Sequence, residues 1–147
     1  MSGRTFLDTN ILVYAVDADE PEKRGLALRL LERLDPGRLV VSTQVLAEFY
    51  VVVTRKLRKR LSEAEAGDRV GQLSTLMTIP TDPSLVKAAV ALSQSARLSL
   101  WDALIVEAAS TAGCDRILTE DLRHGARIGE VRIENPFAVQ SRPTALE

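Results

Sequence analysis

The chain has 147 residues, of which 46% are hydrophobic and 27% are charged, and its formal net charge at pH 7 is −1. This length suits one domain with its own core, and the composition excludes a disordered or fibrous protein. Because the chain is nearly neutral, binding to nucleic acid would need a local basic patch. The apolar runs are broken by charge before the roughly 18 residues that a membrane-spanning helix needs, so we expect no membrane partner.

The sequence has one cysteine, Cys114, and one histidine, His124. No internal disulfide can form, which fits a reducing cytoplasm, and the first residues lack the basic segment and long apolar core of a secretion signal. We therefore expect a cytoplasmic protein. One histidine and one cysteine are too few for most zinc sites, so any chemistry in this chain should rest largely on carboxylates.

Short apolar segments alternate with segments of helical period, which is typical of an α/β domain with a mostly parallel central sheet. Strands are expected at residues 4–7, 39–42, 77–80, 116–119 and 131–133, of which 77–80 is the weakest. Helices are expected at residues 21–34, 43–57, 82–97 and 99–113, with another beginning after an N-cap at Ser62. Residues 1–140 should form a single domain, and residues 141–147 a flexible C-terminal tail.

Four carboxylates occupy positions where ligands bind in such folds. Asp8 follows the first strand and Asp121 follows the strand at 116–119, and the carboxyl ends of parallel strands face the ligand-binding edge of a sheet. Glu48 lies inside the helix at 43–57, and Asp102 lies in the first turn of the helix at 99–113. Neither of these two acids has a lysine or arginine one helical turn away. Partly buried carboxylates without a partner are costly, and a bound cation is one resolution.

If the four acids converge, their mutual repulsion is substantial. Two unit charges about 4 Å apart repel by roughly 4 kcal/mol at an effective dielectric constant of 20. A divalent cation would remove this repulsion, and a set of hard oxygen ligands selects Mg²⁺ or Mn²⁺ in preference to Zn²⁺. Many phosphodiester hydrolases hold one or two such ions in a carboxylate cluster.

Each acid also has a purely structural interpretation. Asp8 can form an Asx-turn, with the next two residues turning the chain before residues 11–14 re-enter the core. Asp102 stands three residues after Ser99, in the spacing of a capping box. Asp121 can favour the first turn of a short helix. For Glu48 the structural alternative is a distant salt bridge. The combination of the four favours the functional interpretation.

These residues lie in four segments, FLDTNILVYAVD, STQVLAEFYVVVTRK, LSLWDALIVEAASTAGC and ILTEDLRHG, which together resemble the PIN-domain family. Within that family they are most similar to the VapC-like toxins of toxin-antitoxin pairs, and the resemblance covers about residues 4–135. It implies a three-layer α/β/α fold with a mostly parallel central sheet. It also implies an endoribonuclease that depends on Mg²⁺ or Mn²⁺.

Carried over by motif, the acidic quartet of the family falls on Asp8, Glu48, Asp102 and Asp121, which the resemblance implies are catalytic residues and metal ligands. The accompanying polar residues fall on Asn10 and Thr119. Glu120 stands beside Asp121, which leaves open which of the two reaches the metal site. VapC-like proteins usually form homodimers and are inhibited by an antitoxin whose C-terminal part packs on the toxin, so the expected partners are RNA, a cognate antitoxin and a second copy of the chain.

Other residues have two interpretations each. The basic run consists of Arg55, Lys56, Arg58, Lys59 and Arg60. It can bind the substrate or simply form a solvated helix end. Trp101 can stack on a base but is expected in the core, and His124 is expected to be incidental to the chemistry.

Four other functions compete, of which a non-catalytic scaffold is disfavoured by the intact set of four acids. A housekeeping RNA-processing enzyme of the same family would work without an antitoxin. A receiver-like signalling domain also binds Mg²⁺ with acids at strand ends, but the expected lysine is missing from the last strand region, VRIENP. A phosphatase with an aspartyl nucleophile normally has a second Asp two residues after the first, where this chain has Asn10.

Overall fold

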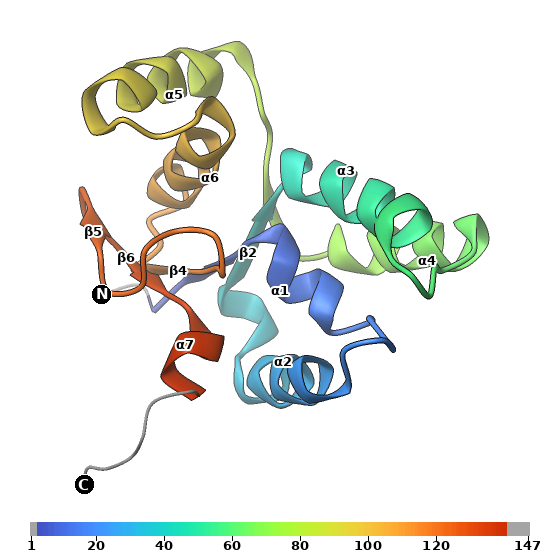
Figure 1. Cartoon of the computed structure of the whole chain (residues 1–147). Helices are drawn as coiled ribbons and strands as arrows, with labels where there is room; N and C mark the ends of the chain where they lie inside the picture. Colours follow the sequence, from blue (N-terminus) through green and yellow to red (C-terminus); the bar gives the residue numbers. More distant parts are fainter. Residues whose placement is uncertain (1–2, 141–147) are drawn as a thin grey trace, which may run out of the picture.

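A six-stranded sheet runs through the centre of the computed structural model, which describes residues 3–140 (Figure 1). The strands are β1 (Thr5–Leu7), β2 (Leu39–Ser42), β3 (Met77–Ile79), β4 (Arg116–Leu118), β5 (Arg127–Ile128) and β6 (Val131–Glu134). Their order is β3-β2-β1-β4-β6-β5, and all neighbours are parallel except β5 and β6. The mostly parallel sheet and the five expected strands are confirmed. The antiparallel β5 was not predicted, because two residues are too short a segment to show a strand period.

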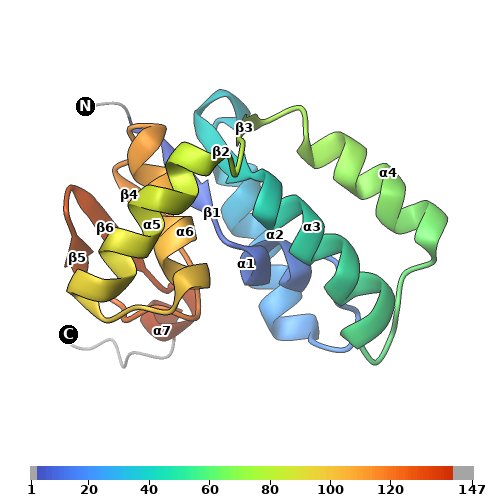
Figure 2. The same cartoon turned by 90° about the horizontal axis from the view of Figure 1, so that it is seen from above.

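Helices cover both faces of this sheet. They are α1 (Thr9–Tyr14), α2 (Pro21–Arg33), α3 (Thr43–Val51), α4 (Glu63–Leu73), α5 (Pro83–Ala96), α6 (Leu100–Thr111) and α7 (Pro136–Gln140), with a 3₁₀ turn at Pro36–Arg38 and a π-helical turn at Val52–Lys56. Figures 1 and 2 show α5 and α6 together on one side of the sheet, with α2 and α7 on the other. The predicted three-layer α/β/α architecture is confirmed. Among residues 3–140, no helix is both long enough and apolar enough to cross a membrane.

The predicted helix starts are confirmed by their caps. The Ser62 hydroxyl accepts from the Glu65 backbone N–H at 3.1 Å, and the Glu65 carboxylate accepts from the Ser62 N–H at 2.9 Å. Asp82 caps α5 by accepting from the Leu85 N–H at 2.9 Å. These side chains satisfy N–H groups that have no partner inside the helix. Local polar residues therefore set where the helices begin.

The helix expected at 43–57 changes from α-helical to π-helical geometry before it ends. It is α-helical only to Val51 and continues as a π-helical turn, in which the Leu57 N–H donates to the Val52 carbonyl at 3.1 Å. The β-branched run Val51–Thr54 crowds an α-helix, and the Thr54 hydroxyl donates to the Tyr50 carbonyl at 2.7 Å. The basic run consequently begins in the π-helical turn and continues into the loop before α4.

Helix α1 was not predicted. Residues 9 and 10 were expected to turn the chain, whereas Thr9–Tyr14 forms a helix with Asp8 in extended backbone conformation at its N-cap. Ile11, Leu12 and Val13 are all buried. An apolar run that is buried on every side has no polar alternation by which helix and strand can be distinguished.

Arg97 ends α5 in the left-handed region, with φ at 57°. Because this conformation costs a residue other than glycine about 1 kcal/mol, Arg97→Gly is expected to raise the free energy of unfolding by about 0.5–1 kcal/mol. Urea denaturation measures the effect. Arg97→Ala keeps the strain and removes the side chain, so an equal gain in that variant would contradict the explanation.

Candidate active site

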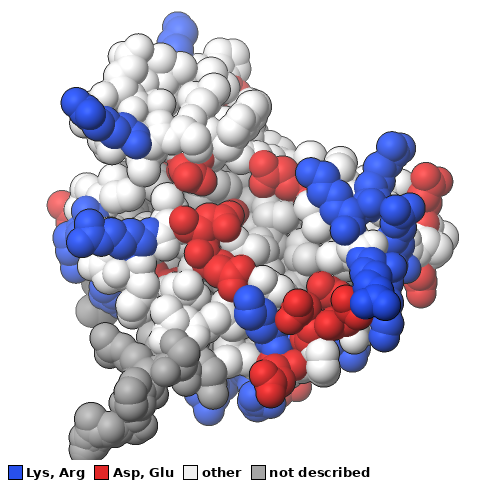
Figure 3. All heavy atoms as spheres, in the orientation of Figure 1, with Lys and Arg blue, Asp and Glu red and all other residues white. Residues whose placement is uncertain are grey.

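The carboxyl ends of β1 and β4 bring the first pair of predicted site residues together. Leu7 pairs with Leu118 at the last position of the two strands, and the Asp8 N–H donates to the Leu118 carbonyl at 3.1 Å. Asp8 and Thr119 therefore leave the sheet at the same level. Figure 3 shows acidic side chains gathered over the middle of this face, in the region where α1, α3 and α6 approach one another in Figure 1.

Asp8 is a buried carboxylate, only 5% exposed. Its Oδ1 accepts from the Thr9 N–H at 2.7 Å and its Oδ2 from the Thr119 hydroxyl at 2.7 Å. Burial raises the pKa of Asp8 to about 6, with smaller contributions from the charges of Asp121 and Glu48, although the two hydrogen bonds oppose the rise. Asp8 was considered as the first residue of an Asx-turn, and in the structure it caps α1 through its own carboxylate. No salt bridge among residues 3–140 neutralises the charge of this buried group.

Glu48 points from α3 toward α1. Its Oε1 accepts from the Thr9 hydroxyl at 2.8 Å, and its Oε2 accepts from the Gln44 side-chain amide at 3.3 Å. Both partners are uncharged. The distant salt bridge considered for this residue is absent, since no ion pair among residues 3–140 includes Glu48 or the other three acids. Gln44 was not predicted as a partner, although its spacing of four residues before Glu48 is the signal that could have found it.

Asp102 is half-buried in the first turn of α6, and Asp121 is exposed in the loop after β4. Burial raises the pKa of Asp102, and the negative charge of Asp121 raises it further. A hydrogen bond with Ser99 acts in the opposite direction, and Glu48 adds a smaller rise. The capping geometry is present, since the Asp102 N–H donates to the Ser99 hydroxyl at 3.1 Å. This bond uses the backbone N–H of Asp102, and the Ser99 hydroxyl, which is uncharged, leaves the charge of the Asp102 carboxylate without a cationic partner among residues 3–140.

Thr119 joins two of the acids. It is fully buried, and its hydroxyl donates to Asp8 while accepting from the Asp121 N–H at 3.0 Å. Asn10 fixes the next residue of the loop, because its Oδ1 accepts from the Glu120 N–H at 3.1 Å. The Asn10 Nδ2 is buried and has no hydrogen-bond partner in the part of the chain that the structure describes.

The Glu120 carboxylate is bound by residues outside the four acids. Its two oxygens accept from the Tyr14 hydroxyl and from the Lys23 ammonium, each at 2.7 Å. The hydrogen bond from Lys23 to Glu120 holds the pKa of Lys23 above its usual range. Because both oxygens of Glu120 already accept hydrogen bonds from Tyr14 and Lys23, Asp121 is the better candidate for the metal site.

The donor set fits a hard divalent cation. Carboxylate oxygens are the ligands that Mg²⁺ and Mn²⁺ prefer. The negative charges of Asp121 and Glu48 raise the pKa of both Asp8 and Asp102, as expected of acids that share one region. Within residues 3–140, however, no three acids, histidines or cysteines already stand as a formed metal cage. Side-chain rotation would be needed to close the carboxylates around an ion.

A cleft of about 640 Å³ opens beside the acids, between α1, α3 and the loop after β4. Asp121 and Glu48 stand in its wall together with Asn10. Its apolar lining comes from the facing sides of α1 and α3 and from the π-helical turn: Val13, Ala47, Val51, Val52 and Leu57. Lys56 is the only member of the basic run in this lining, and the cleft is large enough for part of a polymer chain.

The structure corrects the expected burial of Trp101 and gives His124 a structural hydrogen bond. Trp101 was expected in the core, but it is 63% exposed, because the buried part of α6 begins only at Ala103. Its carbonyl accepts from the Gln44 side chain at 3.4 Å. His124 accepts from the Asn135 N–H at 3.0 Å through its Nδ1, which ties the loop after β4 to the end of β6.

Comparisons with known proteins identify a family and several similar structures. The sequence model described as the PIN domain matches residues 5–130. A toxin-antitoxin complex from Klebsiella pneumoniae is similar with a TM-score of 0.67 and 25% identity, over 90% of this chain and 97% of that one. VapC20 of Mycobacterium tuberculosis, a toxin that cleaves the sarcin-ricin loop, has a TM-score of 0.60 and 20% identity over 80% and 89% of the two chains. DNA-bound VapBC from Salmonella typhimurium has a TM-score of 0.64 and 22% identity over 90% and 98%. A search of the curated proteins gives no match.

The raised pKa of Asp8 has a consequence for stability. Between pH 3.8, the ordinary pKa of an aspartate, and about pH 6, the pKa of Asp8 in the folded protein, the folded protein keeps a proton that the unfolded chain has released. The free energy of unfolding of the metal-free protein therefore falls as pH rises through this range, by at most about 3 kcal/mol, and the loss persists at higher pH. Asp8→Asn, which keeps a good N-cap, is expected to be more stable than the wild type by about 1–3 kcal/mol at pH 8 in a chelator.

Denaturant unfolding at pH 4 and pH 8 measures this difference, which should shrink at the lower pH. Glu130→Gln, at an exposed position away from the acids, is the matched control and should change little at either pH. An Asp8→Asn variant that is less stable than the wild type at pH 8 would contradict the unfavourable burial of this charge.

Proposed function

Because the chain belongs to the PIN-domain family, we propose that it is a metal-dependent endoribonuclease that hydrolyses phosphodiester bonds in RNA, and that it is the toxin of a toxin-antitoxin pair. One observation carries this proposal. Four carboxylates from separate elements meet at the carboxyl ends of β1 and β4, and none has a cationic partner among residues 3–140.

Asp8, Glu48, Asp102 and Asp121 would hold Mg²⁺ or Mn²⁺. Such an ion supplies a Lewis acid that lowers the pKa of water and offsets negative charge on a phosphate. The protein contributes the positions of the ligands: Thr119 orients Asp8 through its hydroxyl, and Thr9 orients Glu48 in the same way. The Nδ2 of Asn10, which has no hydrogen-bond partner among residues 3–140, can donate to a phosphate oxygen of the substrate.

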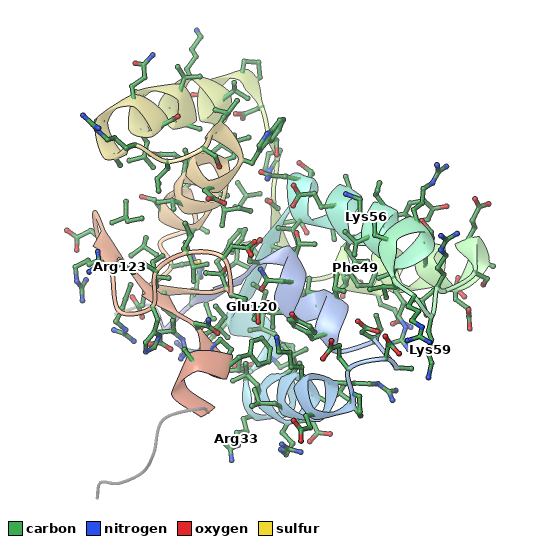
Figure 4. The ribbon with its side chains drawn as sticks, in the orientation of Figure 1. Arg33, Phe49, Lys56, Lys59, Glu120 and Arg123 are labelled. Carbon is green, nitrogen blue, oxygen red and sulfur yellow. The ribbon has the colours of Figure 1, made fainter. Side chains whose placement is uncertain are left out.

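The basic run is proposed to bind the RNA backbone. Arg55, Lys56, Arg58, Lys59 and Arg60 are all exposed. Figure 3 shows Lys and Arg side chains on the same face as the acids, over the ends of α3 and α4, and Figure 4 labels Lys56 and Lys59 in that region. An RNA held there would reach the cleft through Lys56, which lines it. The phosphate contacts would offset the repulsion between RNA and the acidic site.

The antitoxin and the homodimer remain part of this proposal. The similar proteins from Klebsiella pneumoniae and Salmonella typhimurium are a toxin-antitoxin complex and a DNA-bound VapBC, which supports an antitoxin partner for this chain. The cleft suits the C-terminal part of such a partner, because it combines an apolar lining with carboxylates. The expectation of a homodimer rests on the family resemblance.

Membership of the PIN-domain family removes the receiver-like and phosphatase alternatives, which belong to other folds. The housekeeping RNA-processing enzyme remains, since it would use the same site. A gene for a small DNA-binding protein beside the gene for this chain favours the toxin, and growth arrest that this neighbour relieves would distinguish the two functions.

Loss of a metal ligand should abolish cleavage. Purified wild type and Asp102→Asn are each incubated with labelled RNA from the host, with Mg²⁺, with Mn²⁺ and with a chelator. We expect discrete products only from wild type with metal, and a rate lower by about 100-fold or more in Asp102→Asn, because even residues that merely support ligands change activity by 10- to 100-fold. Glu130→Gln is the control and should cleave normally. Cleavage by wild type in the chelator would reject metal dependence.

Removal of basic charges should weaken RNA binding in a salt-dependent way. In an Asp102→Asn background, replacing Arg58, Lys59 and Arg60 by Gln is expected to reduce the slope of log K against log salt by about 2, since each phosphate contact on a single strand contributes about 0.7. Filter binding from low to moderate salt measures this slope. The matched control replaces three exposed arginines of α2, at positions 24, 29 and 33. An equal loss in both triple variants would show that only overall charge matters.

A further inference from the structure

Of the four acids, Asp121 is the one least held in place by secondary structure. Asp8 caps a helix, and Glu48 and Asp102 lie within helices, whereas Asp121 is exposed in the loop that follows β4. A loop position is mobile unless neighbouring residues hold it. The residues on either side of Asp121 in the sequence are therefore relevant to its placement.

Glu120, which precedes Asp121 in this loop, lies at the centre of a cluster of side chains from three helices. Its carboxylate accepts from the Tyr14 hydroxyl at the end of α1 and from the Lys23 ammonium in the first turn of α2, each at 2.7 Å. Lys23 also donates to the Tyr14 oxygen at 3.1 Å. Phe137 of α7 meets the Tyr14 ring edge to face, with the ring centroids 5.0 Å apart. We call these four residues the Glu120 cluster.

Several features distinguish the Glu120 cluster from an ordinary surface ion pair, which contributes little. Both oxygens of the carboxylate are used, so the side chain is held in one orientation. The Lys23 ammonium lies 4.6 Å from the centre of the Tyr14 ring and 5.4 Å from that of Phe137, within the range of cation–π attraction. The cluster joins three helices to one loop residue.

Consecutive residues of the loop are each held by hydrogen bonds. Thr119 is tied to Asp8, while the Glu120 backbone N–H is tied to Asn10 and its side chain to the cluster. The Asp121 N–H donates to the Thr119 hydroxyl. Because the two preceding residues are fixed in this way, the direction in which the Asp121 side chain projects from the loop is restricted.

We infer that Lys23 and Tyr14, acting through Glu120, are positioning residues that hold Asp121 in the metal site. The inference rests on the proposed function in taking Asp121 as a metal ligand. Glu120 itself contributes no ligand, and its negative charge is neutralised by Lys23 so that it does not add to the repulsion among the acids. Helices α2 and α7, which supply none of the four acids, thereby become part of the support of the site.

The first test measures order in the loop without any metal. Amide hydrogen exchange followed by NMR at Glu120 and Asp121 is compared between wild type and Lys23→Met. Exchange at these two amides is expected to be about 10-fold faster in the variant, because the loop opens more often when a charge-assisted hydrogen bond is lost. Lys87→Met, at an exposed position on α5, is the matched control and should exchange like the wild type. Unchanged exchange in Lys23→Met would overturn the inference whatever the metal does.

The second test measures Mn²⁺ affinity by calorimetry in a double-mutant cycle. Lys23→Met is expected to weaken binding about 10-fold in the wild-type background, as for other residues that support metal ligands, and Lys23→Arg should retain most of the affinity. In an Asp121→Asn background, Lys23→Met should change the affinity less than about 2-fold, because the residue through which it acts is gone.

The outcomes separate this inference from the proposed function. An equal loss in both backgrounds would indicate general destabilisation and overturn the positioning role. If wild type bound no Mn²⁺, the proposed function would fail, while the exchange measurement would still decide whether the Glu120 cluster holds the loop.

Discussion

A carboxylate at the end of a buried central strand is the constraint on which this site depends. Asp8 follows β1, which lies between β2 and β4. Among residues 3–140, its carboxylate accepts hydrogen bonds from the backbone amide of Thr9 and the hydroxyl of Thr119. Neither donor carries a charge, so the negative charge of Asp8 is balanced by no residue that the structure describes. A protein that keeps such a group gives up stability in its free form, and a cation that binds there returns it.

The sheet order determines which residues share this environment. Because β1 is flanked by β2 and β4, the helix after β2 carries Glu48 to Asp8 from one side, and the loop after β4 carries Thr119 and Asp121 to it from the other. The Thr9 hydroxyl then donates to Glu48, and the Thr119 hydroxyl donates to Asp8. Hydroxyl links of this kind orient carboxylates without neutralising them, which leaves their charge available to a ligand.

Features that depend on neighbours in the sequence were predicted, and those that depend on distant residues were not. The caps at Ser62 and Asp82 act within three residues, so their helices began where expected. Helix α1 and the exposed position of Trp101 depend on which surfaces pack together, which a single sequence does not reveal. The sequence left open which of Glu120 and Asp121 reaches the metal site. The answer depends on the hydrogen bond from Lys23 to Glu120, which joins residues 97 positions apart in the chain. The acids themselves were recognised because their motifs resemble a family, and their meeting at one edge follows from parallel topology.

The exposed Trp101 has a practical consequence. It is the only tryptophan of the chain, and it stands immediately before Asp102 with its carbonyl bonded to Gln44, which also contacts Glu48. The fluorescence of a solvent-exposed indole responds to changes in local polarity and to nearby quenchers. This protein therefore carries an intrinsic optical reporter at the edge of its acidic site, through which the arrival of an ion, an RNA or a partner chain can be followed without any label.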